Sequence, residues 1–192
     1  MKSFHHILLM KAGPYCGYGL EEIIEIKQKE EKTVGKFFWG YSGVFCRPDL
    51  IKAFASKAGQ NKKKVFVLFT ETKSSYKTTN EGKFSLFSEN KLKWNPLPKK
   101  VLLVGNTEKP HFAICGKNLK KADLKIDLSQ YQVFLKSGLF SDLNKNLADY
   151  FKYRVDKVCG IYSPKKTLEN KVIKIDYVCE LTEPYCVYIK KQ

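Results

Sequence analysis

The sequence predicts an α+β fold in a single domain, with a mixed or antiparallel sheet of about seven to nine strands and about three helices. Its 192 residues match the length of one ordinary domain. Hydrophobic residues make up 43% of the chain and aromatic residues 14%, which is enough for a substantial core. Strand and helix patterns follow one another in mixed order, as is typical of α+β proteins. We therefore expect one globular domain over residues 1–192.

The first half of the chain predicts three strands, at residues 4–11, 36–45 and 64–70. The third is almost wholly apolar, as expected of a strand in the centre of a sheet. A helix over residues 20–32 is predicted from apolar residues at helical spacing, with Lys27 on the same face. These apolar residues are Leu20, Ile23 and Ile24. A second helix is predicted to begin at Pro48, because proline suits a first turn, and to end near Gly59.

The second half is predicted to contain a long polar loop or flap, further strands and one more helix. The flap spans residues 71–98, where serine, threonine, asparagine and lysine predominate. Strands are predicted at residues 100–104, 111–115 and 155–162, with another strand pair within 124–135. Apolar spacing predicts an amphipathic helix over residues 137–153. Residues 172–181, the turn Thr-Glu-Pro and residues 185–189 predict a terminal hairpin.

The net charge of +16 points to anionic partners such as nucleic acids, nucleotides or acidic proteins. Two features also fit a purely compositional origin. Only Arg47 and Arg154 are arginines among the 35 basic residues, although phosphate and base recognition favours arginine. The excess is even, with 17 basic and 9 acidic residues (+8) over 1–96 and 18 and 10 (+8) over 97–192. A functional and a compositional explanation of the charge both stay open.

Apolar runs and cysteines predict the cellular location of the protein and whether it has metal sites or disulfides. No apolar run approaches the ~18 residues of a membrane span, and the run over residues 7–10 is shorter than a signal-peptide core. We therefore expect a cytoplasmic protein of a bacterium or a phage, without a membrane partner. The six cysteines form no C-x-x-C pair and only three histidines accompany them, so no metal and no cofactor are predicted. Without a secretion signal, a disulfide framework is not expected.

Two segments share the order apolar strand, glycine- and tyrosine-rich corner, helix. They are GPYCGYG (residues 13–19) and FFWGYSGVFCRP (residues 37–48). A helix N-terminus behind glycines offers backbone N–H groups to a phosphate, and aromatic rings can stack on a base. An arginine at such a corner can pair with the phosphate through two hydrogen bonds. The ligand-binding residues predicted here are Tyr15, Tyr18, Trp39, Gly40, Tyr41, Ser42, Gly43 and Arg47.

Each corner also has a purely structural interpretation. A strand-to-helix turn needs glycine whatever its function, and Phe37, Phe38 and Trp39 are ordinary core residues. Neither corner matches a Walker loop or a G-x-G-x-x-G fingerprint. Glu21 and Glu22 begin the first helix and would repel an anion, so the second corner is the better candidate. If the corners lay at adjacent strand ends, they would form one cleft.

The polar flap supplies further candidate contacts. Lys73, Ser74, Ser75 and Tyr76 closely follow a predicted buried strand. Their ammonium and hydroxyl groups could close over a phosphorylated ligand. An exposed connection without a binding role is the alternative.

Candidate catalytic residues are few, so the sequence favours a protein that is not an enzyme. Cys46 precedes a helix and neighbours an arginine, a setting that can activate a thiol, but no partner base is apparent. His5 and His6 are neighbours in a predicted strand, so we expect them on opposite faces of the sheet. His111 begins a separate strand, and neither a His-x-Ser/Thr motif nor an acidic cluster accompanies the histidines.

Three functions follow, in order of preference. The first is non-enzymatic binding of a small phosphorylated ligand, a nucleotide or cyclic nucleotide signal, such as a virus-encoded protein would sequester to blunt host signalling. The second is a basic RNA- or DNA-binding module, whose affinity would fall steeply with salt. The third is a phosphate-ester hydrolase or transferase that uses Cys46 or a histidine. The sequence does not specify an oligomeric state, and a homo-oligomer is compatible with each function.

Overall fold

The computed structural model describes residues 4–43, 45–73, 81–106, 111–135, 147, 151, 157–164 and 171–192. The helices in these residues are α1 (Leu20–Val34), α2 (Pro48–Gln60) and the short 3₁₀ helix η1 (Leu128–Gln130). The strands are β1 (His6–Ala12), β2 (Phe37–Ser42), β3 (Val65–Glu71), β4 (Glu81–Lys83), β5 (Leu86–Ser88), β6 (Asn95–Pro96), β7 (Val104–Asn106), β8 (His111–Asp127), β9 (Tyr131–Val133), β10 (Lys157–Tyr162) and β11 (Val172–Lys190).

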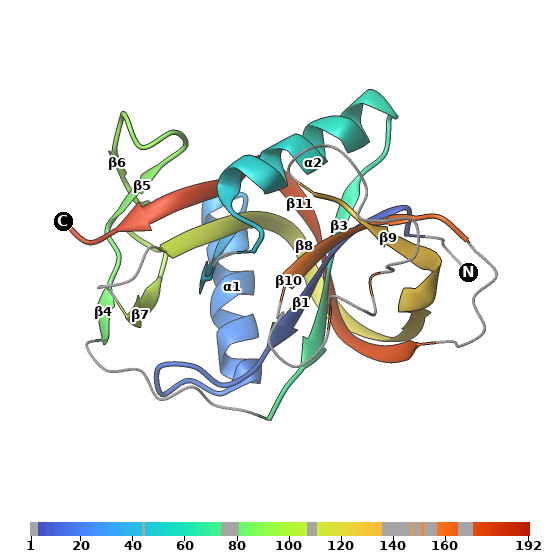
Figure 1. The fold of residues 1–192 in the computed structure, drawn as a ribbon. Coiled ribbons are helices and arrows are strands. Elements are labelled where there is room, and N and C mark those ends of the chain that lie inside the picture. Colours follow the sequence, from blue (N-terminus) through green and yellow to red (C-terminus); the bar gives the residue numbers. More distant parts are fainter. Residues whose placement is uncertain are drawn as a thin grey trace.

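A mixed sheet of nine strands organises the described part of the chain (Figure 1). Seven strands follow the order β2-β8-β11-β3-β1-β10-β9, β5 pairs with β11, and β6 pairs with β5. β1 and β3 run parallel, and the other neighbours in this order are antiparallel. The predicted α+β class with a mixed sheet is therefore confirmed. The described residues contain two α-helices rather than three, and the helix predicted over residues 137–153 falls outside them except for Leu147 and Phe151.

The predicted terminal hairpin is wrong, because β11 is one long strand that lies beside β8 for most of its length (Figure 1). Leu181 pairs with Gly116 and Cys186 pairs with Ile114. Five steps along β11 thus match two along β8, and the Thr-Glu-Pro segment forms a bulge instead of a turn. A bulge absorbs extra residues and bends a strand without reversing it.

Two smaller strand predictions also need correction. Residues 124–127 continue β8, and η1 separates them from β9, so they do not form a strand pair with it. The strand predicted at residues 100–104 is displaced to β7, which pairs with β4 in a separate two-stranded sheet. In both cases a local pattern of apolar residues gave the type of element but not its ends or its partner.

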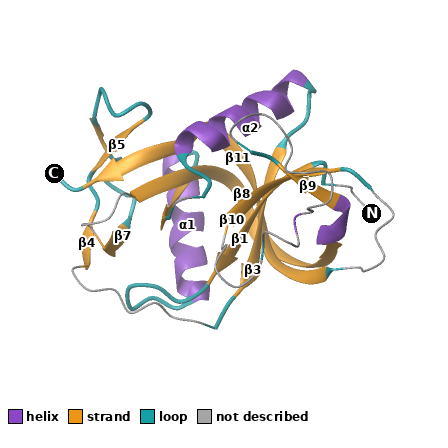
Figure 2. Ribbon diagram, in the orientation of Figure 1, coloured by secondary structure: helices purple, strands orange, loops and turns teal. Residues whose placement is uncertain are grey.

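α1 and α2 both contribute to one large buried cluster with the sheet. Leu20 and Ile24 of α1 and Ile51 and Phe54 of α2 lie in this cluster with Trp39 of β2. Figure 2 shows α2 crossing β11. Alternate strand residues face the other way and form two further clusters, as the two-residue period of a strand requires. One of these is covered by Leu103 and neighbouring apolar residues of the segment before β7.

A buried ion pair fastens α1 to the edge strand β2. Lys27 Nζ donates to Glu30 Oε1 at 2.6 Å and to the carbonyl oxygen of Leu102 at 2.7 Å. Glu30 Oε1 also accepts from the backbone N–H of Leu102 at 2.9 Å, and Oε2 accepts from that of Phe38 at 3.2 Å. Lys27 is only 5% exposed, as its position on the apolar face of the helix predicted. The pair satisfies an otherwise unpaired N–H of the edge strand, which a buried edge needs.

Candidate anion-binding cleft

Three strand ends and the start of α2 meet at one end of the sheet. Ser42 ends β2 and pairs with His111 at the start of β8, which in turn pairs with Ile189 near the end of β11. The corner after β2 leads into α2, and Arg47 occupies the N-cap position of that helix. A cleft of about 610 Å³ lies at this meeting point.

The lining of the cleft combines cations with aromatic rings. Its charged residues are Arg47, Asp49, Lys91 and Lys190. Its ring-bearing residues are Trp94, His111, Phe112 and Tyr188. With three cations and one acid, the described lining carries a charge of +2 when the histidine is neutral (3 − 1 = 2). Volumes of roughly 300–1,000 Å³ and a mainly apolar lining with a few polar groups are typical of small-molecule sites.

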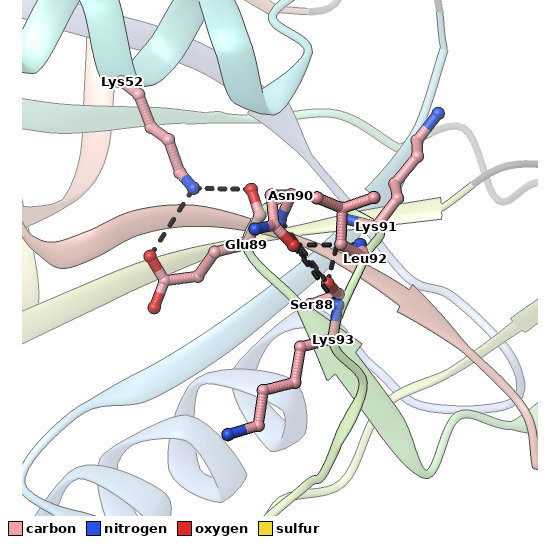
Figure 3. A network of polar contacts seen from close by, with 7 residues as sticks. All are labelled: Lys52, Ser88, Glu89, Asn90, Lys91, Leu92 and Lys93. Carbon is pink, nitrogen blue, oxygen red and sulfur yellow. Dashed lines mark hydrogen bonds and ion pairs between the residues drawn. The ribbon is translucent and has the colours of Figure 1, made fainter.

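The loop between β5 and β6 brings Lys91 and Trp94 to the cleft, and its shape is set by its own hydrogen bonds (Figure 3). The buried Ser88 Oγ accepts the backbone N–H of Lys91 at 2.9 Å. Asn90 Oδ1 accepts the backbone N–H of Leu92 at 2.9 Å. Side-chain acceptors of this kind stabilise a turn by taking up N–H groups that no strand pairs. The position of Lys91 is therefore supported by residues that do not line the cleft.

A second contact ties the same loop to α2. Lys52 Nζ donates to the backbone carbonyl of Glu89 at 2.8 Å and lies 3.7 Å from its carboxylate Oε2 (Figure 3). The ion pair is partly exposed and contributes little energy by itself. Its consequence is geometric, because the loop and the helix that form two sides of the cleft are held at a fixed spacing.

Two cation–π contacts link this loop to the end of β11 in both directions. Lys91 of the loop places its ammonium group 4.6 Å from the ring centroid of Tyr188 on β11. Lys190 of β11 places its ammonium group 4.2 Å from the ring centroid of Trp94 in the loop. Such contacts contribute about 0.5–1 kcal/mol each at exposed sites. Both lysines are exposed, and these contacts favour positions of their ammonium groups at the lining of the cleft.

The corner between β2 and α2 depends on unusual backbone angles. Gly43 has φ +130°, a conformation that side chains rarely adopt, and no atom lies within 4 Å of the place a Cβ would take. Cys46 has φ +54°, which is uncommon for a residue other than glycine. The hydroxyl of Tyr41 donates to the carbonyl oxygen of Cys46 and so holds this residue from inside the core. The turn then delivers Arg47 to the cleft at the N-terminus of α2.

Three of the ligand-binding residues predicted from this corner line the cleft, namely Ser42, Gly43 and Arg47. The other three belong to the packing. Trp39 is 8% exposed and its ring lies 4.7 Å from that of Phe69. A Cβ at Gly40 would come within 3.2 Å of Leu103, so this glycine serves a close approach between segments. Tyr41 is buried, and burial raises the pKa of its hydroxyl well above the usual range. Its position in the core leaves little ring surface for stacking.

The first corner does not contribute to the described lining of the cleft. Tyr15 and Tyr18 pair with each other through two backbone hydrogen bonds of 3.0 Å. The Tyr15 hydroxyl and the Nε2 atom of His111 lie 3.1 and 3.2 Å from the place a Cβ of Gly105 would take. Both therefore pack against β7, and a larger residue than glycine would disturb them.

The flap candidates are not brought to the cleft either, as far as the structure describes them. Lys73 is exposed and follows β3 at the end where Phe69 pairs with Tyr177, whereas Ile189 marks the cleft end of β11. Ser74, Ser75 and Tyr76 lie outside the described residues.

The expectation that His5 and His6 face opposite ways is wrong. Their rings stack with centroids 4.8 Å apart, and their Nδ1 atoms are 3.1 Å apart. The reason is that β1 begins at His6, so His5 does not follow the alternation of a strand. His6 is buried, and burial, followed by His5 and nearby lysines, lowers its pKa to about 4. Among the described residues its Nε2 atom has no hydrogen-bond partner.

The buried cysteines do not face the cleft. Cys46 is 2% exposed, and its Sγ lies 3.9 Å from that of Cys159 within the helix-covered core. Cys186 Sγ lies 3.2 Å from the Tyr41 hydroxyl. The neighbouring Cys46 thiol and burial together raise the pKa of Cys159, and burial raises that of Cys186. Raised pKa values disfavour the thiolate, the reactive form. No disulfide links the six cysteines.

Sequence reasoning missed seven lining residues, which are Asp49, Lys91, Trp94, Phe112, Tyr188, Ile189 and Lys190. Lys91 and Trp94 lie within the predicted flap, but at the opposite end from the contacts chosen there. Tyr188 and Lys190 belong to a strand end whose neighbours only the sheet order determines. A lysine beside an aromatic residue at each place was the only available signal, and such pairs are common in a chain this rich in lysine.

No protein-family model matches the chain, and neither a curated protein nor a solved structure matches it. Within the described residues, no helix is long and apolar enough to cross a membrane. The same residues contain no group of three or more metal-ligating side chains. The geometry of the cleft is therefore the basis for a functional conclusion.

Proposed function

We propose that the protein binds a small phosphorylated ligand of the nucleotide class in the cleft and does not transform it. One observation carries the proposal: Arg47, Lys91 and Lys190 converge with Trp94 and Tyr188 on a single cleft of about 610 Å³. Cations recognise phosphate and flat rings recognise a base, and nucleotide sites need both. The volume is sufficient for a mononucleotide.

Binding without turnover is favoured by the positions of the nucleophile and base candidates. The Cys46 thiol is buried in the core, away from the lining. His111 does line the cleft, but its Nε2 atom lies beside β7, and its ring packs 4.7 Å from that of Phe84. A general base has to come within hydrogen-bond reach of the proton it removes. The buried Cys46 does not meet that requirement, and the packing of His111 against β7 and Phe84 turns its Nε2 atom to structural contacts.

Arg47→Ala provides the test, with binding followed by calorimetry and by thermal shift. Adenosine 5′-monophosphate, adenosine 5′-diphosphate and cyclic AMP are the probes. Removing one charged hydrogen-bond donor to phosphate costs about 1.5–3 kcal/mol, so affinity should fall roughly ten- to a hundredfold. Arg47 is exposed, so the melting temperature without ligand should change little. Lys63→Ala, an exposed lysine beyond the other end of α2, is the matched control and should bind normally.

A short single-stranded RNA, used as a further probe, distinguishes nucleotide binding in the cleft from the nucleic-acid alternative. A nucleotide held in the cleft should still bind when salt is raised from low to high, because few phosphates are engaged. The proposal is refuted if only the RNA binds, if its affinity falls steeply with salt, and if Arg47→Ala and Lys63→Ala reduce that affinity equally. The diffuse positive charge would then be the binding surface.

A further inference from the structure

The charge of the cleft narrows the class of ligand, on the assumption that the proposed function holds. We infer that the cleft selects a dianionic terminal phosphate, a phosphomonoester, over the monoanionic phosphodiester of a cyclic mononucleotide. The observations that carry this inference are the excess of two positive charges in the described lining and the way in which its cations are held.

The three cations come from three separate elements that approach the cleft from different directions. Arg47 stands at the start of α2, Lys91 in the loop between β5 and β6, and Lys190 at the end of β11. Asp49 is the acidic residue among the described lining residues, and its negative charge offsets one of the three positive charges. An ion with a single negative charge would leave one positive charge of the lining uncompensated, whereas a dianion would balance it.

The two ammonium groups are positioned before any ligand arrives. The Lys91 ammonium group lies over the ring of Tyr188 and the Lys190 ammonium group over that of Trp94, while the buried Ser88 holds only the backbone of Lys91. A preorganised cation gives up less side-chain freedom on binding, so more of its attraction to phosphate appears as affinity. A second negative charge about 6 Å from one such cation, at an effective dielectric constant of about 40, corresponds to roughly tenfold in affinity.

The chain also contains a reporter at the site. Its two tryptophans are Trp39, buried in the core, and Trp94, half-buried in the cleft lining. In a Trp39→Phe protein the tryptophan fluorescence comes from Trp94 alone. A ligand bound beside Lys190 changes the surroundings of this ring and should change its emission, whereas binding elsewhere should not.

The experiment titrates adenosine 5′-monophosphate and cyclic AMP, which share a base and a sugar, into the Trp39→Phe protein and, by calorimetry, into the unmodified protein. The monophosphate should bind about tenfold more tightly at pH 7.5. Its advantage should shrink between pH 7.5 and 5, because a phosphomonoester gains a proton near pH 6 and a phosphodiester does not.

Variants of the charged residues test whether these side chains cause the preference for the monophosphate. Lys91→Ala and Lys190→Ala should each reduce the preference for the monophosphate, whereas Lys93→Ala should leave it unchanged. Lys93 is the matched control, since it lies in the same loop and its side chain points away from that of Lys91 (Figure 3). Asp49→Asn should strengthen binding of the monophosphate more than that of cyclic AMP, since it removes the offsetting charge.

The outcomes separate this inference from the proposed function. If both nucleotides bind at the cleft equally well, or if the preference is independent of pH and of Lys91, the selection for a dianion is refuted while the binding function stands. If neither changes the emission of Trp94 and neither releases or absorbs heat on titration, the proposed function fails and the inference fails with it.

Discussion

Replacing Lys27 with methionine should lower the free energy of unfolding by about 3–5 kcal/mol at pH 7, the usual cost of breaking a buried ion pair. Methionine keeps the length of the side chain and removes its charge, so the buried carboxylate of Glu30 loses its cation at 2.6 Å. The backbone carbonyl of Leu102 loses a donor at 2.7 Å as well. The side chains of Lys27 and Glu30 are 6% and 1% exposed, so water cannot replace either contact without structural change.

The loss is large because the remaining partner stays buried. Removing one member of a buried ion pair leaves the other charge uncompensated, which usually costs roughly 3–5 kcal/mol. The carbonyl of Leu102, which loses its donor, accounts for about 1 kcal/mol of this loss.

Urea denaturation at pH 7 is the assay, with the variant compared with the unmodified protein. Lys29→Met is the control, because Lys29 is exposed on the same helix, and it should change stability by less than about 0.5 kcal/mol. A loss below about 1 kcal/mol for Lys27→Met would contradict the reasoning.

Two further predictions concern residues that the sequence made candidates for function. The low pKa of His6, about 4, means that the folded protein resists protonation there, so its contribution to stability is full above pH 6.5 and is lost as the pH falls toward 4. The loss is at most about 2.5 × 1.36, or roughly 3.4 kcal/mol. A His6→Phe protein followed by thermal denaturation between pH 7.5 and 4 should lack this loss, and an unchanged pH profile would count against a buried neutral histidine. Trp39→Ala should reduce stability by about 3–5 kcal/mol and leave nucleotide affinity of the folded protein unchanged, as measured by urea denaturation and calorimetry. Loss of affinity at full stability would instead make Trp39 a ligand contact.

The fold class was predictable from the sequence because periodicity is local. Helix α1 repeats its apolar residues at helical spacing, β3 is a short continuous apolar run, and proline and glycine mark the ends of α2. The same spacing placed Lys27 on the apolar face of α1, but its burial and its pairing with Glu30 are known only from the structure. The Thr-Glu-Pro bulge shows the limit, since the same residues suit a turn or a bulge until the pairing with β8 decides.

For the candidate site, the sequence by itself determined one side. The glycines and the arginine ahead of α2 predicted a corner suited to an anion. In the structure, Ser42, Gly43 and Arg47 of this corner line the cleft. Only the tertiary structure decided the opposite side, where Lys91 and Lys190 arrive from segments about 100 residues apart. Local periodicity carries no information on which strand ends become neighbours, because the order of strands in a sheet is fixed by long-range packing. The sheet order β2-β8-β11, with β5 attached to β11, is what gathers these cations around one cleft.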